Sequence, residues 1–348
     1  MRNGNGNGAD RIVLMNSRQV TSVLKGRELD IVRLVRTAYE THANGDSSLP
    51  HSTFLRFAEN ERDRIIALPA CLGQDFQVAG VKWIASFPGN QELNLDRASA
   101  LVILNSTRTG RPEAILEGSV ISAKRTAASA ALAAQHLCDK EDSAAVGIIG
   151  CGLINFETVR FLMAVYPEIR QFVCYDIDVE RATQFTRKLH GSWEKVDAMV
   201  AEDVRSVLRQ CKLIAIATTA LTPSIGDVSE CISGSTILHT SLRDLTPEVI
   251  LACDNIVDDV DHVCRAATSV HLAEQLSGNR DFIRCTLADI TSGRSPGRRD
   301  PNSIAVFSPF GLGVLDMALA QWVLKQGREQ EEGTVIESFL PDSSWLER

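Results

Sequence analysis

The chain has 348 residues, of which 44% are hydrophobic and 23% are charged, and its formal net charge is -8 at pH 7. This length predicts about two domains, because it exceeds what one ordinary hydrophobic core supports. The negative charge argues against nucleic acid as a partner, and no apolar run approaches the roughly 20 residues that span a bilayer. We therefore expect no nucleic-acid partner and no membrane association.

The nine cysteines are scattered along the chain without a Cys-x-x-Cys pair, which is typical of a reduced, cytoplasmic protein. Neither cysteines nor histidines have the spacing of metal ligands, so we expect no metal. His239, His262 and His271 are interpreted as packing or surface residues.

The first third of the chain has a mixed pattern. Residues 1–10 form a Gly/Asn tract that we expect to be a disordered tail, and apolar residues at helical spacing predict a helix over 28–42. An alanine-rich helix from about 122 to 138 closes this part. Between the helices, short apolar runs separated by Gly, Pro and Asn predict strands at 54–57, 64–68, 78–87, 100–105 and 114–121.

From Ala144 onward, strands and helices alternate. This alternation predicts parallel strands joined by right-handed crossovers, which is the doubly wound Rossmann arrangement of an α/β protein. We assign the final helix, about 314–325, to the first domain. The expected domains are a discontinuous α+β domain at 11–124 plus 312–348 and a Rossmann domain at 125–311. Strands are expected at 146–150, 172–176, 213–219, 236–240, 256–258 and 304–307.

A glycine turn follows the first strand of the Rossmann domain. Gly150 and Gly152 stand where the backbone approaches a phosphate, and the helix that follows directs its free N–H groups at that anion. Asp176 ends the next predicted strand, where such folds bind the adenosine ribose, and its charge favours NAD over NADP. Asn155 replaces the third glycine or alanine of the fingerprint, so a doubly wound domain with an empty or different nucleotide site is the alternative.

Three cations are candidate substrate ligands. Lys82 lies within an apolar strand, and if it is buried its charge needs a partner. Arg56 is expected on an adjacent strand, from which both cations could clamp a substrate carboxylate. The alternative, equally supported, puts Lys82 on the solvent face. Arg125 and Thr126 are placed at the start of the alanine-rich helix, where a surface charge and a helix cap are the alternatives.

Asp244 follows the predicted strand 236–240. Ligands of open α/β sheets bind beyond the carboxyl ends of the strands, so Asp244 is placed to act as a general base or to bind an ammonium group. Considered alone, the residue fits better as the N-cap of a helix that begins near Thr246 and Pro247.

From about residue 12 to 324 the chain resembles the ornithine cyclodeaminase and mu-crystallin family. The resemblance rests on RIIALP at 64–69, GVKWI at 80–84, RTAA at 125–128, GIIGCG at 147–152, VFSPFG at 306–311, Asp244 and Asp316. Segments 96–99, 102–105 and 118–122 resemble the branch of the family that makes 2,3-diaminopropionate. That branch uses NAD to cleave N-(2-amino-2-carboxyethyl)-L-glutamate into L-2,3-diaminopropionate and 2-oxoglutarate for siderophore or peptide-antibiotic pathways.

The resemblance also implies roles for residues. It puts Arg56, Lys82 and Arg125 on substrate carboxylates and Asp244 on the reacting amine, with Lys82 and Asp244 as the catalytic residues. It implies an α+β domain that binds the substrate and forms a homodimer. The implied NAD contacts are Thr126, Gly150, Cys151, Gly152, Leu153, Ile154, Asp176, Thr218, Thr219, Ser241 and Gly311.

Two other functions are compatible with the resemblance. One is ornithine or lysine cyclodeamination, which is weakened because Ile66 stands where true cyclodeaminases have a glutamate. The other is a mu-crystallin-like protein that binds a nucleotide and a small ligand without turnover. The presence of Lys82, Arg125 and Asp244 favours a catalysed reaction over binding without turnover.

Overall fold

The computed structural model describes residues 11–139 and 144–341, so the predicted disordered tail lies outside the described residues. The described chain divides into two compact units. The first comprises the residues up to Arg27, Gly45–Ser122 and those from Gly313 onward, and the second comprises Glu28–Asn44 and Ala123–Leu312. The sequence places 28–44 in the first domain, whereas this helix packs against helices of the second unit. In the described ranges, no helix is long and apolar enough to cross a membrane.

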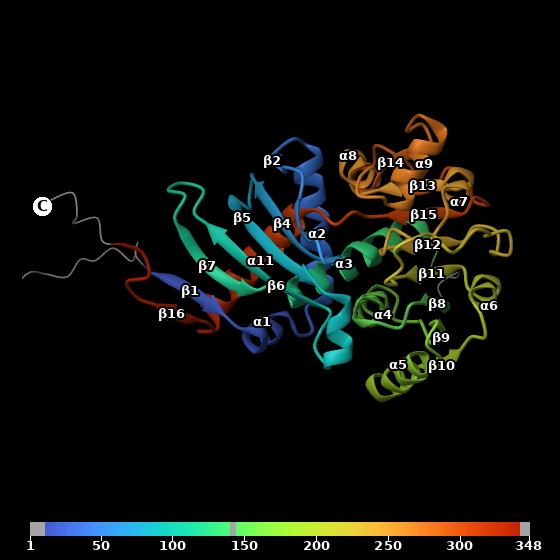
Figure 1. Cartoon of the computed structure of the whole chain (residues 1–348), viewed down its shortest axis with the longest axis horizontal. Helices are drawn as coiled ribbons and strands as arrows, with labels where there is room; N and C mark the ends of the chain where they lie inside the picture. Colours follow the sequence, from blue (N-terminus) through green and yellow to red (C-terminus); the bar gives the residue numbers. More distant parts are fainter. Residues whose placement is uncertain (1–10, 140–143, 342–348) are drawn as a thin grey trace, which may run out of the picture. The chain divides into compact units, whose positions relative to one another are not determined.

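The second unit is built on a parallel eight-stranded sheet (Figure 1). The strands are β8 (Ala145–Ile149), β9 (Gln171–Tyr175), β10 (Asp197–Val200), β11 (Leu213–Ile216), β12 (Thr236–His239), β13 (Asp254–Val257), β14 (Ile283–Thr286) and β15 (Ala305–Ser308). Their order is β10-β9-β8-β11-β12-β15-β13-β14. From β8 the chain proceeds outward to β9 and β10 and then returns to β11 on the other side of β8. The topological switch point, where ligands bind in such sheets, therefore lies between β8 and β11.

Helices accompany these strands: two precede the first strand and the others connect successive strands. They are α2 (Glu28–Ala43), α3 (Ser119–Leu137), α4 (Leu153–Val165), α5 (Val179–Ser192), α6 (Val204–Gln210), α7 (Pro247–Ala252), α8 (Val260–Val263), α9 (Ser269–Ser277) and α10 (Leu287–Thr291). The predicted Rossmann fold is confirmed.

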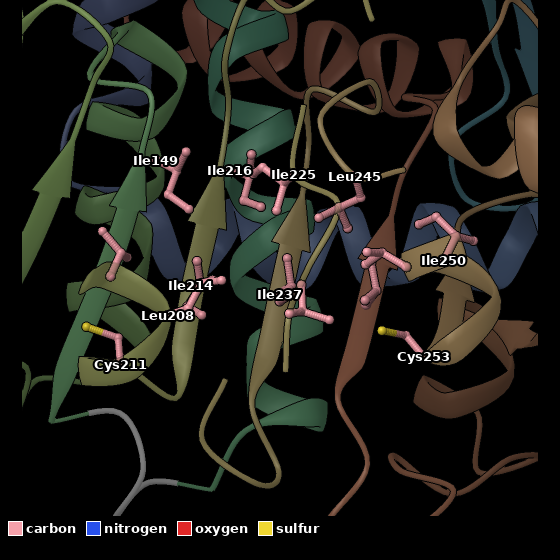
Figure 2. Close-up of a cluster of buried hydrophobic side chains, with 14 of the residues drawn as sticks. Ile149, Leu208, Cys211, Ile214, Ile216, Ile225, Ile237, Leu245, Ile250 and Cys253 are labelled. Carbon is pink, nitrogen blue, oxygen red and sulfur yellow. The ribbon is translucent and has the colours of Figure 1, made fainter. Parts of the chain in front are cut away.

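One face of this sheet is covered by α6, α7 and α9. Ile149, Ile214 and Ile237 on the strands pack with side chains of these helices, among them Leu208 and Ile250 (Figure 2). Burial of this kind explains why the strands read as continuous apolar runs. Burial raises the pKa of the Cys211 thiol in this core to about 12, so the thiol stays protonated at neutral pH. All nine cysteines are free thiols.

The first unit is an α+β structure with a mixed sheet. Its strands are β1 (Ile12–Met15), β2 (Ser47–Ser48), β3 (Thr53–Phe57), β4 (Asn60–Leu72), β5 (Val78–Ser86), β6 (Ala98–Asn105), β7 (Pro112–Glu117) and β16 (Thr334–Ile336). The order is β16-β1-β7-β6-β5-β4-β2, with β3 paired to β4. The helical segments are α1 (Ser17–Leu24), the 3-10 turn η1 (Pro88–Leu93) and α11 (Gly313–Glu329).

Two boundaries differ from the sequence prediction. The strand predicted to reach residue 121 ends at Glu117, because α3 begins at Ser119. The Glu117 carboxylate accepts the first N–H groups of that helix, from Ser119 at 2.7 Å and Val120 at 3.0 Å. Arg125 and Thr126 consequently lie in the second turn of α3 and not at its start, so Thr126 is not the helix cap.

Helix α11 packs against β4, β5 and β6. The contact is close at Gly80 on β5, where an added Cβ would lie 2.0 Å from the Ile103 carbonyl oxygen and 3.0 Å from the Met317 sulfur. Side chains alternate across a strand, so Lys82 lies on the same face of β5 as Gly80. The fold thus directs a lysine at the buried face of α11.

Candidate active site

The glycine turn after β8 occupies the switch point. Gly150 has φ +90, and an added Cβ would lie 2.4 Å from the Ala217 carbonyl oxygen, so only glycine suits this position. Gly152 is the N-cap of α4 and makes no side-chain capping bond, and an added Cβ there would meet nothing within 4 Å. Asp176 accepts the backbone N–H of Cys151 at 2.7 Å, which ties the turn to the end of β9. Open space, free helix N–H groups and a strand-end carboxylate are together the features that fit a dinucleotide.

Asn155, the departure from the glycine fingerprint, bonds the helix to the strand. Its side chain is fully buried and donates to the carbonyl oxygens of Ile149 at 2.9 Å and Gly150 at 2.7 Å. These carbonyls lie where β8 ends and the turn begins. The asparagine therefore holds the turn with hydrogen bonds where a glycine or alanine would allow only close packing.

We expect Asn155→Ala to lower the free energy of unfolding by about 1–3 kcal/mol, because buried carbonyls lose their donor. Urea denaturation measures this, with Asn44→Ala, an exposed asparagine after α2, as the matched control. The turn should also loosen, so NAD affinity should fall. An Asn155→Ala protein as stable as the control would show that the amide does not hold the turn.

Asp244 lies beyond the carboxyl end of β12 and is 1% exposed. Its carboxylate accepts hydrogen bonds from the hydroxyls of Thr218 and Ser241, and the Nε2 atom of His239 lies 3.1 Å from Oδ2. Burial alone would raise the pKa of this carboxyl. The hydrogen bonds and the positive charge that His239 can carry outweigh burial and hold the pKa below its usual range. The geometry therefore keeps a charged base at the edge of the sheet.

The N-cap interpretation of Asp244 is wrong. The N-cap of α7 is Thr246, with Pro247 at the first helical position. Asp244 instead faces the end of its own strand, because the segment after β12 turns back and an extended bridge joins Leu245 to Ile225.

His239 is a functional candidate that the sequence interpretation missed. It is the last residue of β12, it is completely buried, and it contacts Asp244 on one side and the Ser308 hydroxyl on the other, 3.3 Å from Nδ1. The sequence carries a weak signal for this role, a histidine that ends a buried strand five residues before an aspartate.

Five more of the residues predicted to contact the cofactor lie at the same edge of the sheet. Thr218 and Ser241 bond to Asp244, and Thr219 is exposed beside Thr218. Leu153 and Ile154 form the first turn of α4.

Arg125 and Gly311 are in contact. An added Cβ at Gly311 would lie 2.7 Å from the Arg125 Nη1 atom, and Gly311 has φ +89. The Gly311 N–H donates to Asp258, which directly follows β13, at 2.8 Å, and Phe310 donates to the same carboxylate at 2.8 Å. Burial raises the pKa of Asp258 to about 6, although these N–H groups favour its charged form.

Asp258 gives a pH prediction. The folded protein keeps this carboxyl protonated up to pH about 6, whereas the usual value is 3.8, so its contribution to stability is present at low pH and is lost as the pH rises through this window. Between about pH 4 and pH 7 the wild type should lose on the order of 3 kcal/mol more than Asp258→Asn, which cannot titrate. Urea denaturation across that range tests this, and equal pH dependence in the two proteins would refute it.

Lys82 is buried in the first unit. It is 2% exposed, and its Nζ atom lies 2.7 Å from the Asp316 carboxylate on α11 and 3.1 Å from the Ser122 hydroxyl. The alternative of a solvent-facing Lys82 is therefore wrong. The neighbouring strand residues Leu68 and Val102, which pair with Lys82, are also buried.

Arg56 does not share a clamp with Lys82. It is exposed on β3, and β4 separates β3 from β5, so the predicted adjacency is wrong. Through the register of β4, Arg56 aligns with Ser86, four residues from Lys82. Strand spacing puts the two Cα atoms roughly 15 Å apart, compared with about 5 Å for directly paired positions on adjacent strands.

Comparison with known proteins identifies relatives over most of the chain. The model of the ornithine cyclodeaminase/mu-crystallin family matches residues 13–331. The N-((2S)-2-amino-2-carboxyethyl)-L-glutamate dehydrogenase of Staphylococcus aureus is 29% identical over 308 residues, which cover 87% of this chain and 91% of that protein. Two solved structures share the fold at 24% identity. The Delta(1)-pyrroline-2-carboxylate reductase of Thermococcus litoralis, in complex with NADH and L-proline, has a TM-score of 0.86 and covers 93% of this chain and 99% of its own. An archaeal alanine dehydrogenase dimer with bound NAD has a TM-score of 0.84 and covers 94% and 99%.

Proposed function

The chain belongs to the ornithine cyclodeaminase/mu-crystallin family, and from this premise we propose that it is an NAD-dependent dehydrogenase that cleaves a C–N bond of an amino-acid substrate. The substrate proposed is N-(2-amino-2-carboxyethyl)-L-glutamate, and the products are L-2,3-diaminopropionate and 2-oxoglutarate. The observation that carries the proposal is the buried, charged Asp244 on the same sheet edge as a turn that fits a dinucleotide.

NAD would be held by the glycine turn, the first N–H groups of α4 and Asp176, and when bound it supplies a hydride acceptor. The chain's own residues do the rest. Lys82, Arg125 and Arg56 bind the substrate's carboxylates, which fixes the Cα–H that is oxidised.

Asp244 takes the proton from the secondary amine as the C=N bond forms. Water then adds to the imine carbon, and the C–N bond breaks to release a primary amine and a 2-oxo acid. Asp244, now protonated, returns its proton to the leaving nitrogen. The carboxylate that accepts in the first half donates in the second.

An assay with NAD and N-(2-amino-2-carboxyethyl)-L-glutamate tests the proposal. NADH should accumulate in equal amount to 2-oxoglutarate and 2,3-diaminopropionate. Proline or pipecolate formed from ornithine or lysine, without net NADH, would replace this function by cyclodeamination. Binding of NAD and of the amino acid without any product would leave the mu-crystallin-like function.

We also propose that the protein is a homodimer through the outer face of the first unit's sheet. By strand register Leu55, Trp83 and Leu101 share that face, and they are 48%, 42% and 47% exposed. Clustered apolar side chains of this kind mark association surfaces. Light scattering on the purified chain tests this.

We further propose a cytoplasmic location, which suits nine free thiols, and a place in siderophore or nonribosomal peptide biosynthesis.

A further inference from the structure

His239 faces Asp244 through two contacts that need opposite protonation states. Its Nε2 atom lies 3.1 Å from Asp244 Oδ2, a hydrogen bond that needs one proton between the two atoms. The same Nε2 atom lies 3.2 Å from the backbone nitrogen of Asp244, whose N–H donates to Nε2 only when Nε2 carries no proton. Nε2 therefore has a hydrogen-bond partner whether or not it carries a proton.

The other ring nitrogen has the same freedom. Nδ1 lies 3.3 Å from the Ser308 hydroxyl, which donates to a bare nitrogen and accepts from a protonated one. Ser308 and His239 are both buried, at 1% and 0% exposure, so bulk water does not compete for these bonds. A proton can therefore arrive at or leave either nitrogen of the imidazole while both keep a partner.

Thr218 and Ser241 cannot accept a proton from Asp244. Their hydroxyls hold the Asp244 carboxylate by donating to it, but an alcohol does not accept a proton from a carboxylic acid at neutral pH. Imidazole is the side chain whose charge changes readily in that range. Of the three side chains that bond to the carboxylate, only His239 can share its proton.

We infer that His239 is the positioning residue that shares the proton of Asp244, with Ser308 accepting from Nδ1 behind it. The inference rests on the proposed role of Asp244 as the acceptor of the substrate's proton. The amine N–H bond breaks and an O–H bond forms on Asp244. The neutral ring that receives the proton carries its own proton on Nδ1, which donates to Ser308, so Nε2 is bare. The proton then passes from Oδ2 to Nε2, which regenerates the carboxylate beside an imidazolium. No electrons are exchanged, and the return of the proton to the product amine reverses each step.

Two substitutions separate proton sharing from orientation. His239→Gln keeps an amide donor toward Asp244 but cannot accept a proton, and His239→Asn keeps an amide toward Ser308 only. We expect kcat to fall roughly 10-fold to 100-fold in His239→Gln, a part of the 10²–10⁴ that a positioned base contributes, and further in His239→Asn. KM and the NAD dissociation constant, measured by fluorescence, should stay within about twofold. The control is His271→Gln on α9, outside this cluster. A kcat of His239→Gln equal to that of the control would overturn the inference.

A second measurement does not depend on turnover. Nitrogen-15 NMR of the full chain with labelled histidine identifies the His239 signals as those that His239→Gln removes. We expect the ring proton on Nδ1 in the wild type, where the Ser308 hydroxyl accepts it, and on Nε2 in Ser308→Ala, because Nδ1–H then loses its acceptor. The same tautomer in both proteins would overturn the inference. If the tautomers differ but no amino acid supports NADH formation, the coupling of His239 to Ser308 stands and the proposed function fails.

Discussion

Asp244→Asn should lower kcat by roughly 10²–10⁴-fold, the contribution expected of a positioned general base. The asparagine has the same shape and can still bond to Thr218, Ser241 and His239, so the fold and the glycine turn should be preserved. What it lacks is a site that accepts the substrate's proton. Steady-state NADH formation measures the loss, and a fluorescence titration should give an NAD dissociation constant close to that of the wild type.

The matched control is Asp281→Asn, an exposed aspartate elsewhere in the second unit, which should keep full activity. Undiminished turnover in Asp244→Asn would remove Asp244 from the mechanism. Loss of NAD binding together with turnover would instead make it a residue that holds the cofactor site together.

Asp316→Ala should lower the free energy of unfolding by about 3–5 kcal/mol, the usual effect of removing one partner of a buried ion pair. Lys82 would remain 2% exposed with its charge uncompensated. The double variant Lys82→Met with Asp316→Leu should recover most of this stability, because it removes both charges and fills the volume with apolar groups. Activity should be lost in the double variant, since the proposed substrate cation is absent.

A double-mutant cycle of Lys82→Met and Asp316→Leu in urea measures the coupling between the two residues. The control is Asp261→Ala, which breaks an exposed pair with Arg280 and should change stability by less than about 1 kcal/mol. If the double variant is destabilised by the sum of the two single effects, the buried pair does not act as a unit.

The sequence predicts the second unit well because its signals are local. Alternating apolar runs predict the parallel sheet, and parallel strands bring their carboxyl ends to one edge, so the sequence alone places Asp176 and Asp244 at that edge. Asn155 could not be interpreted in this way. Its hydrogen bonds go to carbonyls of the turn, and a pattern of residue types does not record where a side-chain amide points.

The first unit depends on pairings that the sequence does not record. Strand order is one of them, because Arg56 and Lys82 are separated by β4 and not by a single step in the sheet. The sequence also does not record on which face of the sheet Lys82 lies, because its partner Asp316 comes from a helix far along the chain. His239 was missed for a related reason. Its partner Asp244 follows β12 and its partner Ser308 is the last residue of β15, and the two residues come together only when β12 pairs with β15.

The separation of Lys82 from Asp316 also orders events during synthesis on the ribosome. Strands β4, β5 and β6 emerge early, but the helix that covers them begins at Gly313, after the last residue of the second unit. The second unit has all its strands by Ser308 and can fold as domains generally do, while the chain is still growing. The first unit must hold an uncovered sheet, with a lysine on its apolar face, until α11 leaves the exit tunnel. A chain truncated before α11 would therefore expose the apolar face of this sheet and be bound by chaperones.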